Sequence, residues 1–540
     1  MEIIETDCLV IGAGLAGSAY ALHAARAGRR VELLALEGPL VANSDWAQGG
    51  IIYEPGDPAR LGADIVAASD GTSNPAAVEQ LVREGPAAVK ELLLDELGVA
   101  FDRDAAGALD LAREGGHSAR RILHAKDLTG HAILAAVAAR VDATPGITRR
   151  GGWVSVDLLT LSHSTDLVAE RYAPLTCFGA YVLDTAAGVV RAIVARRTVL
   201  AAGGLGQIFL HTTNQPGSVG HGVAMAYRVG ARLIDLEYVQ FHPTAFHRPN
   251  APGFLVTEAL RGEGAVIVNA RGDRFVDRAH PAGSLAPRDV VARAIHEELA
   301  ASGEPCAYLD LGALTPGFLR ARFPTVAARC AAHGVDVDRG PIPVVPAAHF
   351  SCGGVHTDLA GRTNVRNLGA IGETACTGLH GANRLASTSL LECLVGARAA
   401  AAAAVTELAA ERGPLPRPRP WRGADRPADP TLIRQDLELV RSTMWNYAGI
   451  VRSPRRRPRA PHPARVARGD PRVLPRLPPE PRAAGAAQRG ADRAFGRTRR
   501  VPEPAEPRLP LDRGGAPWHS RTFFIRLTVA RPRADGGFDG

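Results

Sequence analysis

DCLVIGAGLAG, residues 7–17, is the stretch of this chain that decides its predicted fold. Residues 7–11 are mostly apolar and predict a short buried strand, and the run from Leu15 to Ala27 predicts a helix. Residues 30–36 predict a second strand. The order strand, glycine turn, helix and strand is typical of a dinucleotide-binding unit, in which the helix N-terminus faces phosphate groups.

The three glycines of this stretch have separate physical roles. Gly12 suits the tight turn, Gly14 lets the backbone approach a pyrophosphate, and Gly17 lets the helix pack closely on the strand. An acidic residue that binds a ribose hydroxyl is expected roughly 20 residues further on. Ala35 stands there instead, and Glu37 comes slightly late. The motif therefore indicates a dinucleotide without choosing between NAD and FAD.

The composition predicts a large globular protein. A chain of 540 residues is long enough for about two to four domains. Its seven cysteines include no Cys-x-x-Cys pair, so we expect free thiols in a reducing cytoplasm and no metal site. We find neither a basic-then-apolar leader nor an uninterrupted apolar stretch of membrane-spanning length. We therefore expect a cytoplasmic protein with no membrane partner.

The positive charge is concentrated at the C-terminal end. The whole chain has a formal net charge of +8, and residues 451–540 contain 21 arginines, no lysine and eight acidic residues. The remainder of the chain is therefore mildly acidic. The same segment holds 15 of the 40 prolines, a composition typical of a disordered tail or of a nucleic-acid contact. We nevertheless expect no nucleic-acid partner, because this tail has another explanation.

Arginines and histidines lie beside glycine or proline in several distant segments. His242, Arg288, His349 and Arg384 would together suit a substrate with two carboxylates, because guanidinium binds carboxylate through paired hydrogen bonds. Any one of them alone is more often an ordinary core or surface residue. Between about residues 236 and 345 the glycine-turn and strand pattern gives way to mixed segments, which predicts a domain inserted into a nucleotide-binding fold.

These motifs resemble the succinate dehydrogenase/fumarate reductase flavoprotein group and, within it, the L-aspartate oxidases. The resemblance covers roughly residues 5–450. It implies an α/β fold with a bipartite Rossmann-like FAD-binding domain and an inserted α+β capping domain, followed by a disrupted C-terminal helical domain. The implied boundaries are 1–235 and 346–405 for the FAD-binding domain, 236–345 for the cap, and 420–452 for the start of the helical domain.

Three local details favour the L-aspartate oxidases over their relatives. Asn43 stands where succinate dehydrogenases have the histidine that bonds covalently to the flavin, so we expect non-covalent FAD. The loop Arg113-Glu114-Gly115-Gly116-His117-Ser118 resembles the one whose glutamate faces the substrate ammonium group. A dicarboxylate without an amine would be repelled by that glutamate. Cys352 replaces a methionine that is common in relatives.

The resemblance also implies the site residues. Glu114 and Arg288 would be catalytic, with Arg288 as proton donor and acceptor, and no metal is expected. Substrate carboxylates would meet His242, His349 and Arg384. The flavin contacts would be Gly12, Ala13, Gly14, Leu15, Ala16, Gly17, Leu36, Asn43, Ser44, Asp45, Trp46, Ala47, Gln48, Gly49, Gly50, Glu373, Ser389 and Leu390.

The activity that the resemblance implies is FAD-dependent oxidation of L-aspartate to iminoaspartate. Oxygen, giving hydrogen peroxide, or fumarate would accept the electrons. In this family the reaction is the first step of de novo NAD biosynthesis, which implies a functional link to quinolinate synthase. The alternatives are a fumarate reductase or succinate dehydrogenase flavoprotein, and a flavin-binding but inactive product of a disrupted gene.

Two positions depart from the family pattern. His221 replaces an aspartate that approaches FAD, and it cannot act as a carboxylate acceptor. After Arg452 a helical pattern should continue, but prolines 454, 458, 461 and 463 forbid it, since each costs about 3 kcal/mol inside a helix. We infer a shift of reading frame near Ser453, and the alternative is a genuine basic tail. Resequencing the coding DNA distinguishes the two.

Overall fold

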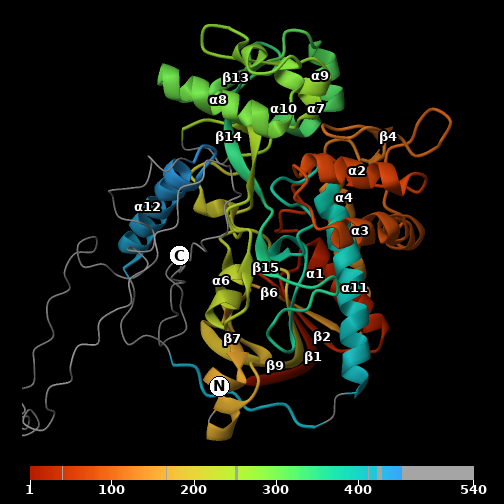
Figure 1. Ribbon diagram of the computed structural model, residues 1–540, viewed down its shortest axis with the longest axis vertical. Helices are drawn as coiled ribbons and strands as arrows, with labels where there is room; N and C mark the ends of the chain where they lie inside the picture. The colour runs from red at the N-terminus through yellow and green to blue at the C-terminus, as the bar shows by residue number, and fades with distance from the viewer. Residues whose placement is uncertain (39, 166, 250–252, 411–412, 423–428, 453–540) are drawn as a thin grey trace, which may run out of the picture.

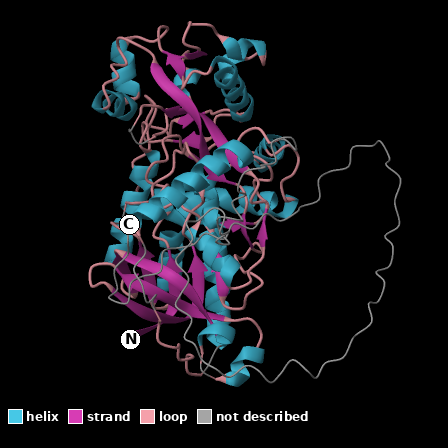
Figure 2. Cartoon of the chain, turned by 90° about the vertical axis from the view of Figure 1, so that its left-hand side faces the viewer, coloured by secondary structure: helices cyan, strands magenta, loops and turns pink. Residues whose placement is uncertain are grey.

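The computed structural model describes residues 1–452, apart from 39, 166, 250–252, 411–412 and 423–428. The predictions made for residues 453–540 lie outside the described residues. Figure 1 shows an elongated arrangement, with the large sheet toward one end of the long axis and a group of helices around β13 (Ala307–Asp310) at the other. Figure 2 shows the same two groups from the side.

The large sheet contains the strand–helix–strand unit predicted from the glycine motif. Its strands follow the order β6-β2-β1-β9-β8-β7, and β16 also pairs with β9. β1, β2, β6, β9 and β16 pair in parallel, whereas β7, β8 and β9 form antiparallel pairs. Their bounds are β1 Ile3–Ile11, β2 Val31–Ala35, β6 Ile147–Gly151, β7 Trp153–Thr160, β8 Cys177–Asp184, β9 Val189–Leu200 and β16 Leu368–Ala370. Helix α1 (Leu15–Arg26) connects β1 to β2.

Both faces of the sheet are covered, which explains why the last four residues of β1, residues 8–11, are all apolar and buried. Side chains alternate between the two faces of a strand. Cys8 and Val10 accordingly join the core under the helices, while Leu9 and Ile11 join a second core on the opposite face. The helical face holds α1, α2 (Pro58–Ala68), α3 (Pro75–Ala88), α4 (Thr129–Ala143) and α11 (Thr388–Ala410). The π-helix Val89–Glu96 continues α3, and α6 (His221–Arg228) lies on the opposite face.

Helix α11 is the one described helix whose length and composition would suffice to cross a membrane. In this fold it packs against α1 and α3, as Figure 1 also shows. Its small residues Ala397, Ala400, Ala401 and Ala404 are all buried in the helical core. Small side chains let helices approach closely, so the apolar character of α11 is accounted for by packing inside the protein.

A separate hydrophobic core lies at the other end of the molecule, away from the large sheet. It contains Val291, Ile295, Leu309 and Val344, all fully buried. Its sheet has the order β11-β14-β13-β12, with bounds β11 Val239–Phe246, β14 Ile342–Ser351 and β12 Val266–Val268. The helices around it are α7 (Ala259–Gly262), α8 (Arg288–Ser302), α9 (Pro316–Arg322) and α10 (Pro324–Ala332). The long strands β11 and β14 run from this core toward the large sheet (Figure 1).

The remaining elements are short, with one exception. Two small sheets comprise β3 (Ile51–Ile52), β4 (Leu111–Ala112) and β5 (Ile122–Leu123), and β10 (Leu233–Ile234), β15 (Gly354–His356) and β17 (Ala375–Cys376); α5 spans Leu161–Ser164. Helix α12 (Pro430–Ala448) is longer and begins at Asp429, whose side chain accepts a hydrogen bond from the Thr431 amide. Trp445 of α12 packs edge-on against His211 and Phe241. The contact with Phe241 packs α12 against strand β11.

Candidate active site

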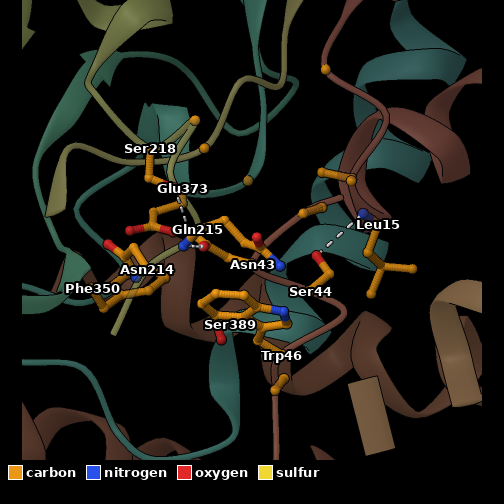
Figure 3. A pocket seen from close by; sticks show the side chains of 18 of the residues that line it. Leu15, Asn43, Ser44, Trp46, Asn214, Gln215, Ser218, Phe350, Glu373 and Ser389 are labelled. Atoms are coloured by element: carbon orange, nitrogen blue, oxygen red, sulfur yellow. Dashed lines mark hydrogen bonds between the residues drawn. The ribbon is translucent and has the colours of Figure 1, made fainter. Parts of the chain in front are cut away.

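A cavity of about 530 Å³ runs from the glycine turn to the predicted arginines and histidines. Figure 3 shows part of its wall, with Asn43, Ser44 and Trp46 beside Asn214, Gln215 and Glu373. The structure brings nearly all of the predicted residues to this cavity. Those that line it are Gly12, Ala13, Gly14, Leu15, Ala16, Leu36, Asn43, Ser44, Trp46, Ala47, Gln48, Gly49, Gly50, Glu114, His242, Arg288, His349, Glu373, Arg384, Ser389 and Leu390.

Two predicted flavin contacts, Gly17 and Asp45, are not among the lining residues. Gly17 is instead required where α1 crosses the turn, because a Cβ there would clash with the carbonyl oxygen of Gly12. The Asp45 carboxylate is engaged by His131 of α4, with its Oδ1 2.9 Å from Nδ1 of the imidazole. Gly17 and Asp45 therefore hold the residues of the cavity wall in place without lining the cavity themselves.

The glycine turn places the N-terminus of helix α1 at the cavity. Gly12 has a φ of +115°, and a Cβ on it would clash with the Ala201 carbonyl oxygen. The amide of Leu15, at the start of α1, donates to the Ser44 hydroxyl at 3.3 Å. Backbone N–H groups and the helix dipole at this position favour an anionic group.

The Asn43 side chain is fixed by two hydrogen bonds, both visible in Figure 3. Its Nδ2 donates to the Ser218 hydroxyl at 2.9 Å, and its Oδ1 accepts from the Gln215 amide at 2.8 Å. On the same wall, Glu373 accepts from the Ser351 amide at 2.9 Å. Burial raises the pKa of Glu373 to about 7. This part of the cavity is thus polar, and Glu373 is about half protonated near neutral pH.

His221 begins helix α6 and also lines the cavity. Its Nε2 is hydrogen bonded to the carbonyl oxygen of Ser155 on β7. Burial lowers the pKa of His221, so the imidazole is a neutral donor to that carbonyl. Reduced affinity for FAD at this position stays a prediction.

Two histidines from β11 and β14 meet at the other end of the cavity, with ring centroids 5.2 Å apart. Nδ1 of His242 accepts from the Thr244 amide at 3.2 Å, so its Nε2 carries the proton. Nδ1 of His349 pairs with the Thr213 hydroxyl at 2.8 Å. Burial, followed by nearby positive charges, lowers the pKa of both imidazoles well below the usual range. They are therefore neutral hydrogen-bonding groups.

Arg384 adds a guanidinium to this cluster. Its Nη2 donates to Oε1 of Gln240 at 3.1 Å, and the group lies 4.7 Å from the centroid of the Phe350 ring. Burial and the charge of Arg288 lower the pKa of Arg384 to about 10. Among the described residues, its Nε and the Nε2 of His242 are buried without a hydrogen-bond partner. Unpaired buried donors are costly, so this cluster is suited to an anionic ligand.

Sequence reasoning missed Glu258, which the structure places at the centre of the charged cluster. Its Oε2 accepts from Nε of Arg288 at 2.5 Å, and its Oε1 lies 3.3 Å from Nη2 of Arg261. Burial opposes ionisation of Glu258, but the two guanidinium charges lower its pKa below the ordinary value. The spacing of Glu258 and Arg261 on one helical turn is the only signal in the sequence, and it is a weak one.

The Glu114 carboxylate also lines the cavity. Its Oε2 accepts a hydrogen bond from the Ser387 hydroxyl at 2.5 Å. A Cβ on Gly49 would clash with its Oε1, so this oxygen lies directly over that glycine. The loop around Glu114 is held by His117, whose Nε2 is 3.0 Å from the carbonyl oxygen of Ala386. Glu258 and Glu373 also line the cavity, but Glu258 is paired with two arginines and Glu373 is bonded to a backbone amide. Glu114 is therefore the carboxylate best placed for a cation, beside donors suited to two carboxylates.

Known proteins match most of this chain. The family of FAD binding domains matches residues 7–390. L-Aspartate oxidase 1 of Ralstonia nicotianae is 44% identical over 464 residues, which are 84% of this chain and 85% of that protein. L-Aspartate oxidase of Pseudomonas aeruginosa is 44% identical over 476 residues, 86% of each chain. The chain belongs to the L-aspartate oxidase family of FAD-binding proteins.

A solved structure supports the same assignment at the level of the fold. A quinol fumarate reductase from E. coli superposes with a TM-score of 0.74 at 28% sequence identity, covering 84% of this chain and 80% of that one. The mixed α/β FAD-binding fold that the family resemblance implied is therefore confirmed.

The residues present fit the FAD that this family binds. Gly14 and Leu15 line the cavity at the N-terminus of α1, where backbone N–H groups favour a phosphate. Asn43 fits a non-covalently bound cofactor because it offers no histidine for a covalent bond. Gln48 also lines the cavity, and among the described residues its buried Oε1 is without a hydrogen-bond partner. An unpaired acceptor in the wall is expected where a bound cofactor supplies the donor.

Proposed function

We propose that this protein oxidises L-aspartate to iminoaspartate and passes the electrons to oxygen, giving hydrogen peroxide, or to fumarate. The observation that carries the proposal is that the Glu114 carboxylate lies in a cavity whose histidines and Arg384 suit two carboxylates. A ligand with two carboxylates and one ammonium group pairs with the carboxylate-binding groups and also with Glu114. Succinate and fumarate pair only with the carboxylate-binding groups.

His242, His349 and Arg384 bind the two substrate carboxylates in this proposal. The unpartnered Nε2 of His242 and Nε of Arg384 gain acceptors when the substrate enters, which removes the cost of leaving them unpaired. Glu114 accepts hydrogen bonds from the ammonium group. Three fixed contacts define the orientation of the Cα–H bond, and orientation of this kind can supply several kcal/mol, about 7–11 in favourable cases.

FAD, when bound, supplies the hydride acceptor for the Cα–H bond and the electron path to oxygen or fumarate. Arg288 lies at the cavity with its Nε on Glu258. Burial alone would lower the pKa of Arg288, but the charges of Glu258 and Glu114 and the hydrogen bond to Glu258 raise it. Arg288 is therefore protonated, and the ionised Glu258 accepts a hydrogen bond from its Nε. In this proposal Glu258 holds the guanidinium of Arg288 in place at the cavity.

The finer architecture belongs to this proposal. Residues 1–235 and 346–405 form the two parts of the FAD-binding domain, residues 236–345 form the cap, and residues 420–452 begin the helical domain. The separate core around Val291 and Leu309, and the pairing of β16 with β9, support this division. A cytoplasmic location and consumption of the unstable imine by quinolinate synthase complete the proposal.

The test uses the purified full chain loaded with FAD. Anaerobic addition of L-aspartate should bleach the flavin absorbance, whereas succinate should not do so at the same rate. The variant Glu114→Gln should lower kcat/KM for aspartate and leave reduction of fumarate by a reduced viologen dye intact. A flavin that stays oxidised with aspartate, or a Glu114→Gln variant with unchanged aspartate turnover, would refute the proposal.

A further inference from the structure

Three separate segments of the chain meet around Ser387. Ser387 ends the turn that leads into helix α11, with Arg384 shortly before this turn and Ser389 in the first turn of α11. Both Arg384 and Ser389 line the cavity. The carbonyl oxygen of Ser387 accepts from the amide of Ile52, just after the glycine loop. The neighbouring Ala386 carbonyl is bound by His117 from the loop of Glu114.

The hydroxyl of Ser387 is directed at one atom, Oε2 of Glu114, at 2.5 Å. Ser387 has a φ of +56°, an uncommon conformation for a residue other than glycine. Such a conformation persists where the surrounding structure determines it, and it recurs at functional sites. The hydrogen bond and the backbone conformation together indicate that the surrounding structure fixes the position of the Ser387 side chain.

This contact fixes the rotation of the Glu114 carboxylate. With Oε2 held by Ser387, Oε1 lies over Gly49, which has no side chain and lines the cavity. Gly49 is therefore the wall position that admits the carboxylate. Arg384 lies three residues before Ser387 in the same segment. Ser387 therefore links Arg384, which binds a substrate carboxylate in the proposed function, to Glu114, which binds the ammonium group.

We propose that Ser387 is a positioning residue that determines specificity for an amino dicarboxylate, because its hydroxyl holds the Glu114 carboxylate at the cavity wall. This inference rests on the proposed function, in which Glu114 binds the ammonium group. Ser387 does not itself contact the substrate amine. It acts through Glu114, so its loss matters for aspartate and not for a dicarboxylate without nitrogen.

The experiment compares Ser387→Ala with the natural chain, both as FAD-loaded enzyme. Loss of a hydrogen bond to a charged group should lower kcat/KM for aspartate roughly 10- to 100-fold, chiefly through KM. Fumarate reduction by a reduced viologen dye should change by less than about threefold, because that ligand makes no use of Glu114. Succinate affinity, measured from the shift in flavin absorbance, should be unchanged or higher.

A second variant and a control separate this role from a structural one. Ser387→Gly also lacks the hydroxyl but adopts positive φ freely, so it should show the same loss without any folding defect. Thr388→Ala is the control, because it removes the adjacent buried hydroxyl, whose Oγ1 donates to the Ala386 carbonyl oxygen. Damage to this segment as a whole would lower the turnover of aspartate and of fumarate equally.

The double variant Ser387→Ala/Glu114→Gln decides the mechanism. If Ser387 acts through Glu114, the double variant should be no worse with aspartate than Glu114→Gln alone. Additive losses, or equal losses with both substrates, would overturn the inference. A loss in Glu114→Gln with none in Ser387→Ala would overturn the inference and leave the proposed function standing. Unchanged aspartate turnover in Glu114→Gln would overturn both.

Discussion

Replacement of Glu258 by glutamine should reveal how strongly the charged cluster depends on one buried carboxylate. Glu258 lies 2.5 Å from Nε of Arg288 and 3.3 Å from Nη2 of Arg261. At an effective dielectric constant near 20, the two attractions amount to about 5–7 kcal/mol each before the desolvation cost is subtracted. Removal of one partner from a buried pair typically costs about 3–5 kcal/mol, because the remaining charge is left uncompensated. Glutamine keeps one acceptor oxygen, so we expect about 3 kcal/mol.

The assay for Glu258→Gln is urea unfolding followed by far-UV circular dichroism, together with turnover of aspartate and of fumarate. Turnover should fall about 100-fold or more with both substrates, because Arg288 loses the carboxylate that holds its guanidinium in place at the cavity. Glu263→Gln, an exposed change on the following turn, is the matched control and should stay within about 0.5 kcal/mol. Equal stability of the two variants would refute the reasoning about the buried cluster.

Three further outcomes follow from the structure. Gly12→Ala should abolish FAD binding, measured by flavin absorbance after gel filtration, because its Cβ would clash with the Ala201 carbonyl. Since burial raises the pKa of Glu373 from its ordinary 4.5 to about 7, the flavin-free protein should lose about 3 kcal/mol of stability as pH rises through that interval. Urea titrations of Glu373→Gln should show no such loss. Trp445→Ala should cost about 2 kcal/mol in thermal unfolding and raise KM for aspartate, because Trp445 packs against Phe241, the neighbour of His242. An unaltered KM would show that α12 does not support the substrate strand.

The glycine turn and its flanking strand and helix could be predicted from the sequence because they depend on local rules. A short apolar run before a glycine turn predicts a buried strand, and the absence of Cβ atoms at Gly12 and Gly17 permits the close approaches seen at the turn. The observed strand Ile3–Ile11 is longer than predicted, since its first residues pair with β9, which lies far away in the sequence.

The sequence indicated that His242, His349 and Arg384 bind carboxylates, because they lie beside glycine or proline in loop-like segments. It did not show that they come together at one end of the cavity. Glu114 and Ser387 are 273 positions apart, and no local sequence pattern predicts their hydrogen bond. Glu258 was missed for the same reason, because its significance arises only from the burial of two arginines around it.

The amino-acid sequence by itself determined the α/β dinucleotide unit, the family and most of the cavity-lining residue types, since these follow from short-range backbone geometry and from motif chemistry. The tertiary structure alone decided which side chains share one cavity, which carboxylate pairs with which guanidinium, and that Gly17 and Asp45 stand behind the wall. The physical reason is that pairing energies and pKa values depend on distance and burial, and both are set when segments remote in the chain pack together.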